Sequence, residues 1–266
     1  MTNYEFQQLI MQKGQELWRD MPWREGTRPY YVLVSELMLQ QTQVARVIPK
    51  FEAFIAAFPD EQALAQASLA DVLKLWQGLG YNTRAKYLHT CARIIMNEFG
   101  GKFPSAANHM LQLPGVGKNT AGAIMAYAFN QPSIFVETNI RTVYIHHFFH
   151  DNFAVSDVQI IEKLEQTIDT QNPRRFYQAL MDYGTWLKAS GVKNNARSKH
   201  YKKQPPLKGS IREVRGQIIA ALSQSEMTQL QLQKQLVADE RFEAALHGLV
   251  RDGLVEKNAK NFHLTK

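Results

Sequence analysis

The stretch LPGVGKNTAGAI, residues 113–124, decides how this chain folds. It places Gly115 and Gly117 one residue apart, immediately before a helix of small and apolar residues. Because glycine adopts positive φ at little steric cost, consecutive backbone N–H groups can converge there on one anion. The N-terminal dipole of the following helix and the charge of Lys118 would both stabilise that anion. The stretch therefore predicts a turn that binds a phosphate group.

This turn is not a nucleotide-binding P-loop, since that motif has Ser or Thr after Gly-Lys and Asn119 follows Lys118 here. A lone GxG pair is also typical of a tight turn between two helices. Leu113-Pro114 before the pair and the helical context make a helix-hairpin-helix the more specific interpretation. The residues expected to contact a phosphate backbone are Gly115, Gly117, Lys118, Asn119 and Thr120.

The chain is basic, with 31 Lys and Arg residues against 24 Asp and Glu residues and a net charge of +7. The segment 192–215 alone carries eight Lys or Arg residues and one glutamate, and eight minus one equals the +7 of the whole chain. Such a block favours a polyanion, and a nucleic-acid backbone is the commonest one in a cell. A solvated linker without a partner is the other interpretation that the charge leaves open.

The composition excludes several classes of protein. With 45% hydrophobic and 11% aromatic residues the chain can bury a core, so wholesale disorder is not expected. No apolar run is long enough to cross a membrane and residues 1–20 lack a signal-peptide core, so no membrane contact and a cytoplasmic location are expected. The single cysteine, Cys91, excludes an internal disulfide, a four-cysteine zinc site and a cysteine-ligated iron–sulfur cluster.

Helical periodicity dominates residues 1–200, with Pro49, FPD at 58–60 and GLG at 78–80 as breakers. An all-α bundle is therefore predicted there. The helices expected from the pattern include 4–19, 29–44, 46–57, 61–67, 69–77 and 82–98. The aromatic residues that lie in apolar patterns, and are expected in the core, are Trp76, Phe129 and Trp186.

A hinge at PP 205–206 and GS 209–210 opens a C-terminal module, residues 205–266. A hairpin is expected in its last stretch, LVEKNAKNFHLTK, at 254–266. Three helices precede the hairpin, and they are expected at 211–222, 229–237 and 242–251. Three helices and a hairpin indicate a winged helix, an α+β variant of the helix-turn-helix. The third helix is more acidic than a helix that reads DNA, so DNA binding, a protein partner and a structural role all stay open.

The stretch VSELMLQQTQVARV, residues 34–47, holds one carboxylate, Glu36, among apolar residues. On a helix it shares a face with Val32, Leu33 and Leu39. Burying an ionised carboxylate on such a face costs several kcal/mol unless something compensates it. On the pattern alone, a solvent-facing or ion-paired glutamate is the simpler interpretation.

Five motifs follow one another along the chain. They are PWR at 22–24, SELMLQQTQV at 35–44, LWQGLGYNTRAKYLH at 75–89, LPGVGKNTAGAI at 113–124 and ETNIRTV at 137–143. In order and spacing they resemble the helix-hairpin-helix DNA glycosylase superfamily, and most of all the MutY-type adenine glycosylases. The resemblance covers roughly residues 1–190. It implies a two-lobed all-α fold with a six-helix barrel-like subdomain at 25–135, a second helical subdomain from 1–24 and 136–204, and DNA gripped between them.

The resemblance assigns roles to two carboxyl groups. The acid at the Glu36 position would protonate a flipped-out adenine, and an apolar pocket would raise its pKa so that it donates a proton near neutral pH. Loss of the base would leave an oxocarbenium-like sugar, which the family stabilises with an aspartate. Here that position is Glu137, one methylene longer, at the start of a helix whose dipole would help to keep it ionised. Because reach matters at such sites, an inactive homologue stays open as an alternative.

The resemblance also assigns roles to single residues outside the two carboxyl groups. Bifunctional relatives have a Schiff-base lysine where this chain has Asn119, and the adjacent Lys118 is rotated by about 100° on a helix, so a monofunctional glycosylase is expected. Gln41 and Asn82 match the positions that wedge beside the partner base of the lesion, although the family has tyrosine at the position of Asn82. The positions expected to line the base pocket are Gln40, Arg24 and Asn139.

The family's iron–sulfur cluster follows the segment matching MDYGTWLK, 181–188, but no cysteine follows it here. No iron–sulfur cluster and no other cofactor are therefore expected, with a monovalent cation at the hairpin left open. His146 and His150 have the spacing of a metal pair, but no third ligand is evident, so no metal site is predicted. The basic residues expected at the DNA backbone in place of the cluster loop are Lys199, Lys202 and Lys203.

The family's C-terminal module for recognising 8-oxoguanine has no counterpart, and the winged helix stands in its place. Excision of adenine from a mispair in double-stranded DNA, within base excision repair, is the first expectation. Hypoxanthine, or uracil or thymine mispaired with guanine, are alternative target bases, and a non-catalytic DNA-binding or scaffold protein is the alternative class. The chain is expected to be a monomer at the bacterial nucleoid, with the winged helix as the site for any protein partner.

Overall fold

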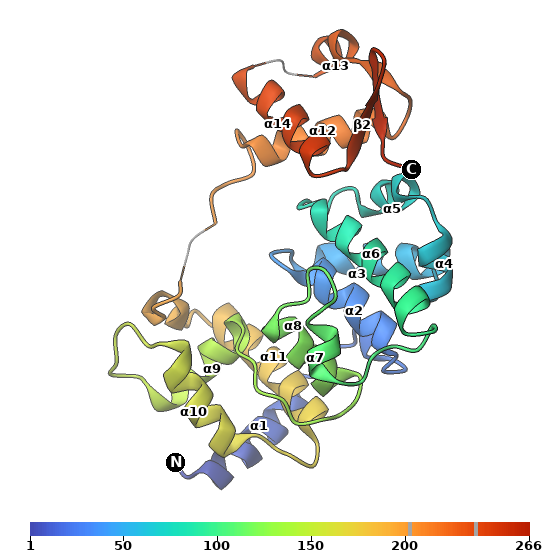
Figure 1. The fold of residues 1–266 in the computed structure, drawn as a ribbon. Helices are drawn as coiled ribbons and strands as arrows, with labels where there is room; N and C mark the ends of the chain where they lie inside the picture. Colours follow the sequence, from blue (N-terminus) through green and yellow to red (C-terminus); the bar gives the residue numbers. More distant parts are fainter. Residues whose placement is uncertain (202–203, 237–238) are drawn as a thin grey trace. The chain divides into compact units, whose positions relative to one another are not determined.

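The computed structural model describes residues 1–201, 204–236 and 239–266, and it is mostly helical with a small three-stranded sheet near the C-terminus (Figure 1). The predicted fold class, all-α with a small α+β module at the end, is confirmed. Contacts group the residues into two compact units, each discontinuous in sequence. The first unit comprises Met1–Leu33, Ser105–Gln112 and Val116–Lys203, and the second comprises Val34–Pro104, Leu113–Gly115 and Gln204–Lys266. The subdomain boundaries expected after residues 24, 135 and 204 remain a prediction.

The helices of the first unit pack around an aromatic core. Phe6, Tyr144 and Tyr177 are fully buried in it, and Phe135 stacks on Tyr177 with 4.2 Å between the ring centroids. The elements of this unit are α1 (Asn3–Glu16), η1 (Pro22–Arg24), α7 (Ala107–Met110), α8 (Lys118–Tyr127), α9 (Thr138–Phe148), α10 (Asp157–Thr167), α11 (Pro173–Ala189) and η2 (Asn194–Arg197). The core is therefore built by segments from both ends of the unit.

Local sequence explains where these helices begin and how closely they approach. Thr2 and Glu5 form a capping box that starts α1. Pro173 starts α11, at a position where a helix needs no N–H donor. Gly14 of α1 faces α11 so closely that a Cβ atom there would lie 2.5 Å from the Cβ of Ala179. Glycine therefore permits the contact between these two helices.

The second unit has a core of its own. Helix α2 (Pro29–Leu39) leads into it, and α3 (Val44–Ala57), α4 (Glu61–Gln66), α5 (Leu69–Trp76) and α6 (Thr83–Glu98) follow. The side chains of Asp60 and Ser68 cap α4 and α5. Trp76 is fully buried, as predicted, and packs edge-on against Phe54 with 6.2 Å between the centroids.

Two features of these helices differ from the prediction. Pro49 lies inside α3, so the predicted break there is wrong. Burial of Phe51 and Phe54 on one face of α3 outweighs the one backbone hydrogen bond that proline removes. Helix α2 ends at Leu39 rather than at residue 44, because Gln41 adopts a left-handed conformation with a φ of 56°.

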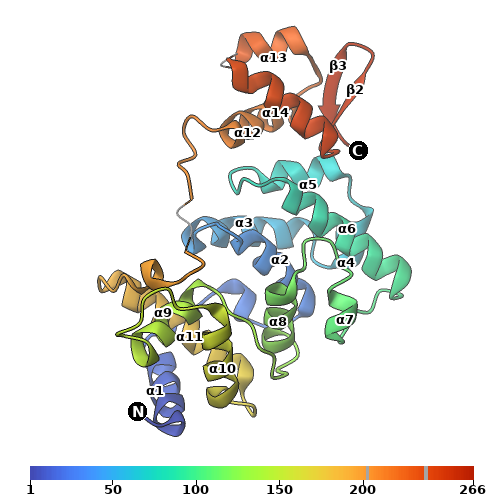
Figure 2. The ribbon, with the colours of Figure 1, turned by 60° about the vertical axis from the view of Figure 1, so that its left-hand side comes forward.

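The C-terminal module has the predicted order of a winged helix. Its elements are α12 (Ile211–Leu222), β1 (Met227–Thr228), α13 (Gln229–Gln235), α14 (Glu240–Arg251), β2 (Val255–Asn258) and β3 (Asn261–Leu264). The sheet is antiparallel in the order β1-β3-β2, and Figure 2 shows β2 and β3 as the wing hairpin. The strand β1 is not among the predicted elements. Val237, the last residue of the predicted helix 229–237, lies outside the described residues.

Candidate active site

Helix α2 carries Glu36 as its one charged residue. The adjacent Ser35 and Leu37 are buried, with 1% and 0% of their surfaces exposed, whereas Glu36 itself is half-buried. Val32 and Leu33, on the predicted apolar face, are also buried. The apolar residues of α2 that precede Glu36 on its helix face are therefore buried, and Glu36 itself keeps partial access to solvent.

The chain turns sharply after α2. The N–H of Gln40 donates to the carbonyl oxygen of Glu36 over 3.3 Å, and Gln41 follows with its left-handed backbone and an exposed side chain. The Thr42 hydroxyl closes the turn, because the carbonyl oxygens of Gln40 (3.3 Å) and Leu79 (3.4 Å) share its one hydrogen. The predicted pocket residue Gln40 is half-buried, and the predicted wedge residue Gln41 lies at the surface.

The turn between α5 and α6 carries the second predicted wedge position. Asn82 is only 8% exposed, whereas Tyr81 is 36% exposed and has a φ of 46°. The guanidinium groups of Arg84 and Arg212 lie over the Tyr81 ring, 5.6 and 5.1 Å from its centroid. Arg212 also donates a hydrogen bond to the Tyr81 hydroxyl over 2.7 Å. Tyr81, rather than Asn82, is therefore the surface side chain of this turn.

Glu137, in the first unit, is the N-cap residue of α9 and is half-buried. The Asn139 amide donates to its Oε1 atom over 3.0 Å. Burial raises the pKa of Glu137 above its usual value, while hydrogen bonds from Asn139 and the charges of Lys188 and Arg141 oppose that shift without cancelling it. Glu137 therefore titrates at a higher pH than an ordinary glutamate, although the predicted effect of the helix dipole acts in the opposite direction.

Two contacts position the start of α9. Asn119 Nδ2 donates to the carbonyl oxygen of Val136 over 2.9 Å, which joins the first turn of α8 to the residue before Glu137. Gly184 of α11 approaches Asn139 so closely that a Cβ atom on the glycine would lie 2.6 Å from the Asn139 carbonyl oxygen. Three predicted site residues are thus brought together within the first unit: Asn119, Glu137 and Asn139.

The glycine hairpin leads directly into α8. Gly115 has a φ of 77°, and a Cβ atom there would lie 2.8 Å from the Tyr87 ring, so glycine is required. Gly117 is the N-cap of α8 with a φ of −86°, so the expectation of positive φ is wrong for this residue. The first three residues of α8 are Lys118, Asn119 and Thr120. Their backbone N–H groups and the helix dipole favour an anion at this end of α8.

The predicted base-pocket residue Arg24 is held by Asp182. Its guanidinium group donates two hydrogen bonds to the carboxylate (2.8 and 2.9 Å), and Arg19 donates a third (2.6 Å). The Asp182 side chain is fully buried, and the Arg24 guanidinium also lies over the Trp18 ring at 4.6 Å. These contacts give Arg24 a structural part in the first unit, and its role in base recognition stays a prediction.

The basic segment after α11 is attached to the end of α9. Arg197 donates hydrogen bonds to the carbonyl oxygens of Phe149 (2.5 Å) and Asn152 (2.8 Å). Lys199, which follows, is exposed and available to a DNA backbone. The other two lysines predicted to contact DNA, Lys202 and Lys203, lie outside the described residues.

The histidine cluster at the end of α9 is engaged in packing. His147 Nε2 forms a hydrogen bond with the Tyr183 hydroxyl over 3.0 Å, and burial lowers the pKa of His147 to about 4. His150 Nδ1 bonds the carbonyl oxygen of His146. Among residues 1–201, 204–236 and 239–266, no group of three or more His, Cys, Asp or Glu side chains is arranged to hold a metal ion. In the same part of the chain, none of the helices combines the length and the apolar character that crossing a membrane requires.

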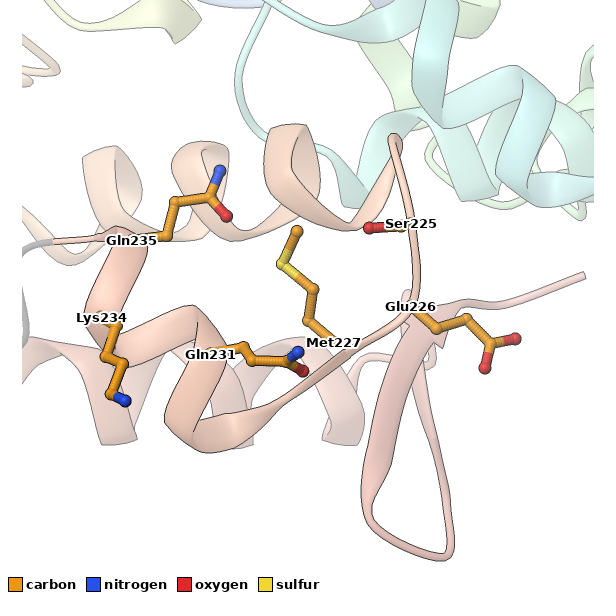
Figure 3. A pocket seen from close by; sticks show the side chains of 6 residues that line it. All are labelled: Ser225, Glu226, Met227, Gln231, Lys234 and Gln235. Atoms are coloured by element: carbon orange, nitrogen blue, oxygen red, sulfur yellow. The ribbon is translucent and has the colours of Figure 1, made fainter.

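A surface pocket lies in the C-terminal module, where the α12–β1 loop, β1 and α13 meet (Figure 3). The residues that line it are Ser225, Glu226, Met227, Gln231, Lys234 and Gln235. None of them was singled out by the sequence as a site residue. The pocket is therefore separate from the residues of the candidate active site.

The sequence pattern misplaced one aromatic residue and missed one basic residue. Trp186, expected in the core, is 45% exposed and stacks on Tyr183. Arg84 is only 6% exposed, and burial lowers its pKa to about 10. No local signal marks it, because an arginine in LWQGLGYNTRAKYLH is equally consistent with a solvated helix face.

The sequence is similar to proteins of base excision DNA repair. A family model described as HhH-GPD superfamily base excision DNA repair protein matches residues 34–169. An adenine DNA glycosylase of Mycolicibacterium smegmatis is 33% identical over 266 residues, which are 91% of this chain and 89% of that protein. An adenine DNA glycosylase of Buchnera aphidicola subsp. Baizongia pistaciae is 38% identical over 192 residues, which are 70% of this chain but 54% of that protein. The chain thus spans about half the length of some curated relatives that it matches.

Two solved structures share the fold. A thermostable thymine-DNA glycosylase is 25% identical with a TM-score of 0.62, over 75% of this chain and 96% of that chain. A non-covalent endonuclease III–DNA complex is 17% identical with a TM-score of 0.61, over 73% of this chain and 91% of that chain. The similarity to the endonuclease III–DNA complex concerns the fold alone.

Proposed function

Because the chain belongs to the HhH-GPD superfamily of base excision DNA repair proteins, we propose that it is a monofunctional DNA N-glycosylase that removes adenine from a mispair. The observation that carries the proposal is the similarity to an adenine DNA glycosylase along 91% of the chain. A single carboxyl group, Glu36, among the apolar residues of α2 supports it with the chemistry that such a reaction needs.

Glu36 is the proposed proton donor. Adenine is a poor leaving group as an anion, but it leaves readily once a ring nitrogen carries a proton. Apolar surroundings disfavour the charged form of a carboxyl group, which favours donation of its proton to the base. The electron pair of the glycosidic bond then departs with the neutral adenine, and the sugar becomes an oxocarbenium-like cation.

Glu137 is the proposed stabiliser of that cation. Its Oε1 atom accepts a hydrogen bond from Asn139, which orients the carboxyl group. A water molecule then adds to the sugar and leaves an abasic site. Asn119 offers no amine that could form a Schiff base, so the proposed enzyme has no strong lyase activity.

Double-stranded DNA is the proposed substrate, bound in part by the hairpin and the first turn of α8. Cys91 supports the hairpin, because its Sγ–H donates to the carbonyl oxygen of Pro114 over 3.2 Å. With this one cysteine the enzyme is proposed to work without an iron–sulfur cluster. We also propose that the protein is a monomer. Its winged helix is proposed to bind a protein partner, since the acidic first turn of α14 disfavours DNA.

A panel of duplexes tests the proposal. Each carries one candidate base: adenine opposite 8-oxoguanine, adenine opposite guanine, hypoxanthine, uracil or thymine opposite guanine. After incubation, heating in alkali cleaves abasic sites, and strand breaks are counted on a gel. We expect breaks at adenine and none before alkali treatment. Breaks without alkali would contradict monofunctional chemistry.

The Glu36→Gln variant is the matched control for the panel. Glutamine has a similar shape but no acidic proton, so single-turnover excision should fall by at least about 100-fold, as for the loss of a general acid. A variant that excises at the wild-type rate would eliminate Glu36 as the donor. A wild-type protein that binds every duplex tightly and cleaves none would favour the non-catalytic alternative.

A further inference from the structure

Arg84, in the first turn of α6, is a buried residue that the proposed chemistry does not use. Only 6% of it is exposed. Its guanidinium group lies over the Trp76 ring at 5.5 Å, and seven neutral oxygen atoms within hydrogen-bond distance share its five N–H groups. They are the carbonyl oxygens of Leu37 (2.6 Å), Met38 (3.0 Å), Gln40 (2.7 Å), Leu79 (3.0 Å), Gly80 (2.9 Å) and Tyr81 (3.4 Å), and the hydroxyl oxygen of Thr42 (3.3 Å).

These acceptors join three pieces of backbone within the second unit. Two carbonyl groups belong to the last turn of α2, directly after the candidate acid. Two acceptors flank Gln41 in the turn 40–42, and three belong to the turn 79–81. The two turns also contact each other directly, through the bond from the Thr42 hydroxyl to the Leu79 carbonyl oxygen. One side chain therefore connects the end of α2 with both turns.

The charge of Arg84 strengthens this connection. Burial lowers its pKa only to about 10, so the guanidinium group stays positive at neutral pH. A buried charge needs compensation, and the carbonyl groups at the C-terminus of α2 form the negative end of that helix dipole. An uncharged side chain at this position would leave several buried carbonyl groups without their donor.

Both turns hold a residue in an uncommon backbone conformation. Gln41 and Tyr81 are not glycines, yet their φ values are 56° and 46°. Such conformations persist only where the surrounding structure enforces them, and they gather at functional sites. Arg84 bonds the carbonyl group that precedes Gln41 and the carbonyl group of Tyr81 itself. The two side chains presented in this way are exposed, whereas Asn82 is buried.

We propose that Arg84 is a positioning residue that locks the turns 40–42 and 79–81 into one rigid surface, from which Gln41 and Tyr81 enter the DNA and keep the target base extruded. The inference rests on the proposed function, since it concerns how a glycosylase holds its substrate. Lysine cannot replace Arg84, because a compact ammonium group lacks the planar fork that reaches acceptors on both turns.

The test compares Arg84→Lys with the wild-type protein and with Arg93→Lys, a matched control at an exposed position of the same helix. Each protein is mixed with a duplex in which 2-aminopurine replaces the adenine, because its fluorescence rises when the base leaves the stack. The melting temperature, the affinity for undamaged duplex and the single-turnover excision of adenine are measured on the same proteins.

We expect Arg84→Lys to be folded at the assay temperature and to bind undamaged duplex as the wild type does. The fluorescence rise should be lost, and excision should be about 100-fold slower, the usual result of misplacing reacting groups by an ångström. The Arg93→Lys control should match the wild type in all four measurements. Should Arg84→Lys melt below the assay temperature, Thr42→Val takes its place, because it removes only the hydroxyl group between the two turns.

A folded variant with an unchanged fluorescence rise would overturn the inference. Slow excision with normal fluorescence would also overturn it, because Arg84 would then act on Glu36 rather than on extrusion. A wild-type protein that extrudes 2-aminopurine but excises no base would defeat the proposed glycosylase activity alone, and the fluorescence would still decide the role of Arg84. A wild-type protein that does neither would overturn both.

Discussion

At the scale of single residues, two carboxyl groups in different surroundings carry the proposed chemistry. Glu36 stands among the apolar residues of α2, which suits a proton donor. Glu137 caps α9 and accepts a hydrogen bond from Asn139, which suits a group that must stay in place while a cation forms. Two titratable groups with distinct environments are what acid-assisted cleavage of a glycosidic bond requires.

We expect the Glu137→Gln variant to become increasingly stable relative to the wild type as the pH rises. Burial raises the pKa of Glu137 above its ordinary value of 4.5, so the folded protein keeps a proton that the unfolded chain has lost. The wild type therefore loses stability as the pH rises from the ordinary pKa through the raised one, whereas glutamine has no such proton. Melting temperatures of both proteins from about pH 4 to about pH 8 measure this difference. A difference that does not grow with pH would refute the raised pKa.

At the scale of elements, the predicted site residues of each unit stand at helix ends. Glu36 lies near the C-terminus of α2, Arg84 at the N-terminus of α6, Asn119 at that of α8 and Glu137 at that of α9. Helix ends carry backbone groups without partners inside the helix, and these groups bind anions, caps or charged side chains. The positions of the helix ends therefore determine where these side chains lie within each unit.

A close approach of α9 and α11 gives a prediction at this scale. A Cβ atom on Gly184 would lie 2.6 Å from the carbonyl oxygen of Asn139 and 2.8 Å from its Cβ. We expect Gly184→Ala to lower the free energy of unfolding by about 1–3 kcal/mol, the usual cost of overpacking. Excision should also slow, because the start of α9 carries Glu137. Urea denaturation and single-turnover excision measure the two effects.

Gly216→Ala is the matched control for that prediction. Gly216 lies in α12, and nothing lies within 4 Å of a Cβ atom added there. Removing glycine from a helix with free space should raise the free energy of unfolding by about 0.5–1 kcal/mol. If both alanine variants were stabilised, the close contact at Gly184 would be absent in solution.

At the scale of the whole molecule, the positive charge is concentrated in one segment that would meet the proposed DNA substrate. The segment 192–215 alone accounts for the net charge of +7. Hydrogen bonds from Arg197, near the start of this segment, join it to the end of α9 within the first unit. This first part of the segment therefore has a defined place in the first unit, so its contact with DNA should depend on position as well as on total charge.

We expect Lys199→Gln to weaken binding to undamaged duplex and to reduce its dependence on salt. Each lost phosphate contact lowers the slope of log affinity against log salt by about 0.9. Titrations at several salt concentrations measure the slope. Lys74→Gln removes the same charge from an exposed ion pair with Asp71, on α5, and should leave the slope as it is. If the wild type, Lys199→Gln and Lys74→Gln all gave the same slope of log affinity against log salt, Lys199 would not contact DNA.

Much of the fold could be predicted from local pattern. The expected helices 61–67, 69–77 and 82–98 lie within one residue of α4, α5 and α6, because apolar spacing, caps and glycine turns are all properties of nearby residues. The predicted end of α2 was wrong, because Gln41 adopts a left-handed conformation, and the carbonyl group before it accepts a hydrogen bond from Arg84, far away in sequence.

The candidate site was predictable in part. Glu36 and Glu137 were singled out through motifs, the structure places both half-buried, and their catalytic roles stay a prediction. The choice between Asn82 and Tyr81 as the exposed residue of one turn was not predictable, because adjacent residues differ in burial only through tertiary contacts. Trp186 shows the same limit, since an apolar pattern does not tell how much of a helix face the neighbours cover.

The sequence by itself determined the helical class, the glycine hairpin, the excess positive charge and the lack of cysteine ligands for a cluster, since these follow from residue identity and short-range order. Tertiary structure decided what the sequence left open: that Tyr81 lies at the surface, that Glu137 titrates at a raised pH and that Arg84 ties two turns to α2. The reason is physical. Burial and hydrogen bonding between distant residues exist only once the chain has brought them together.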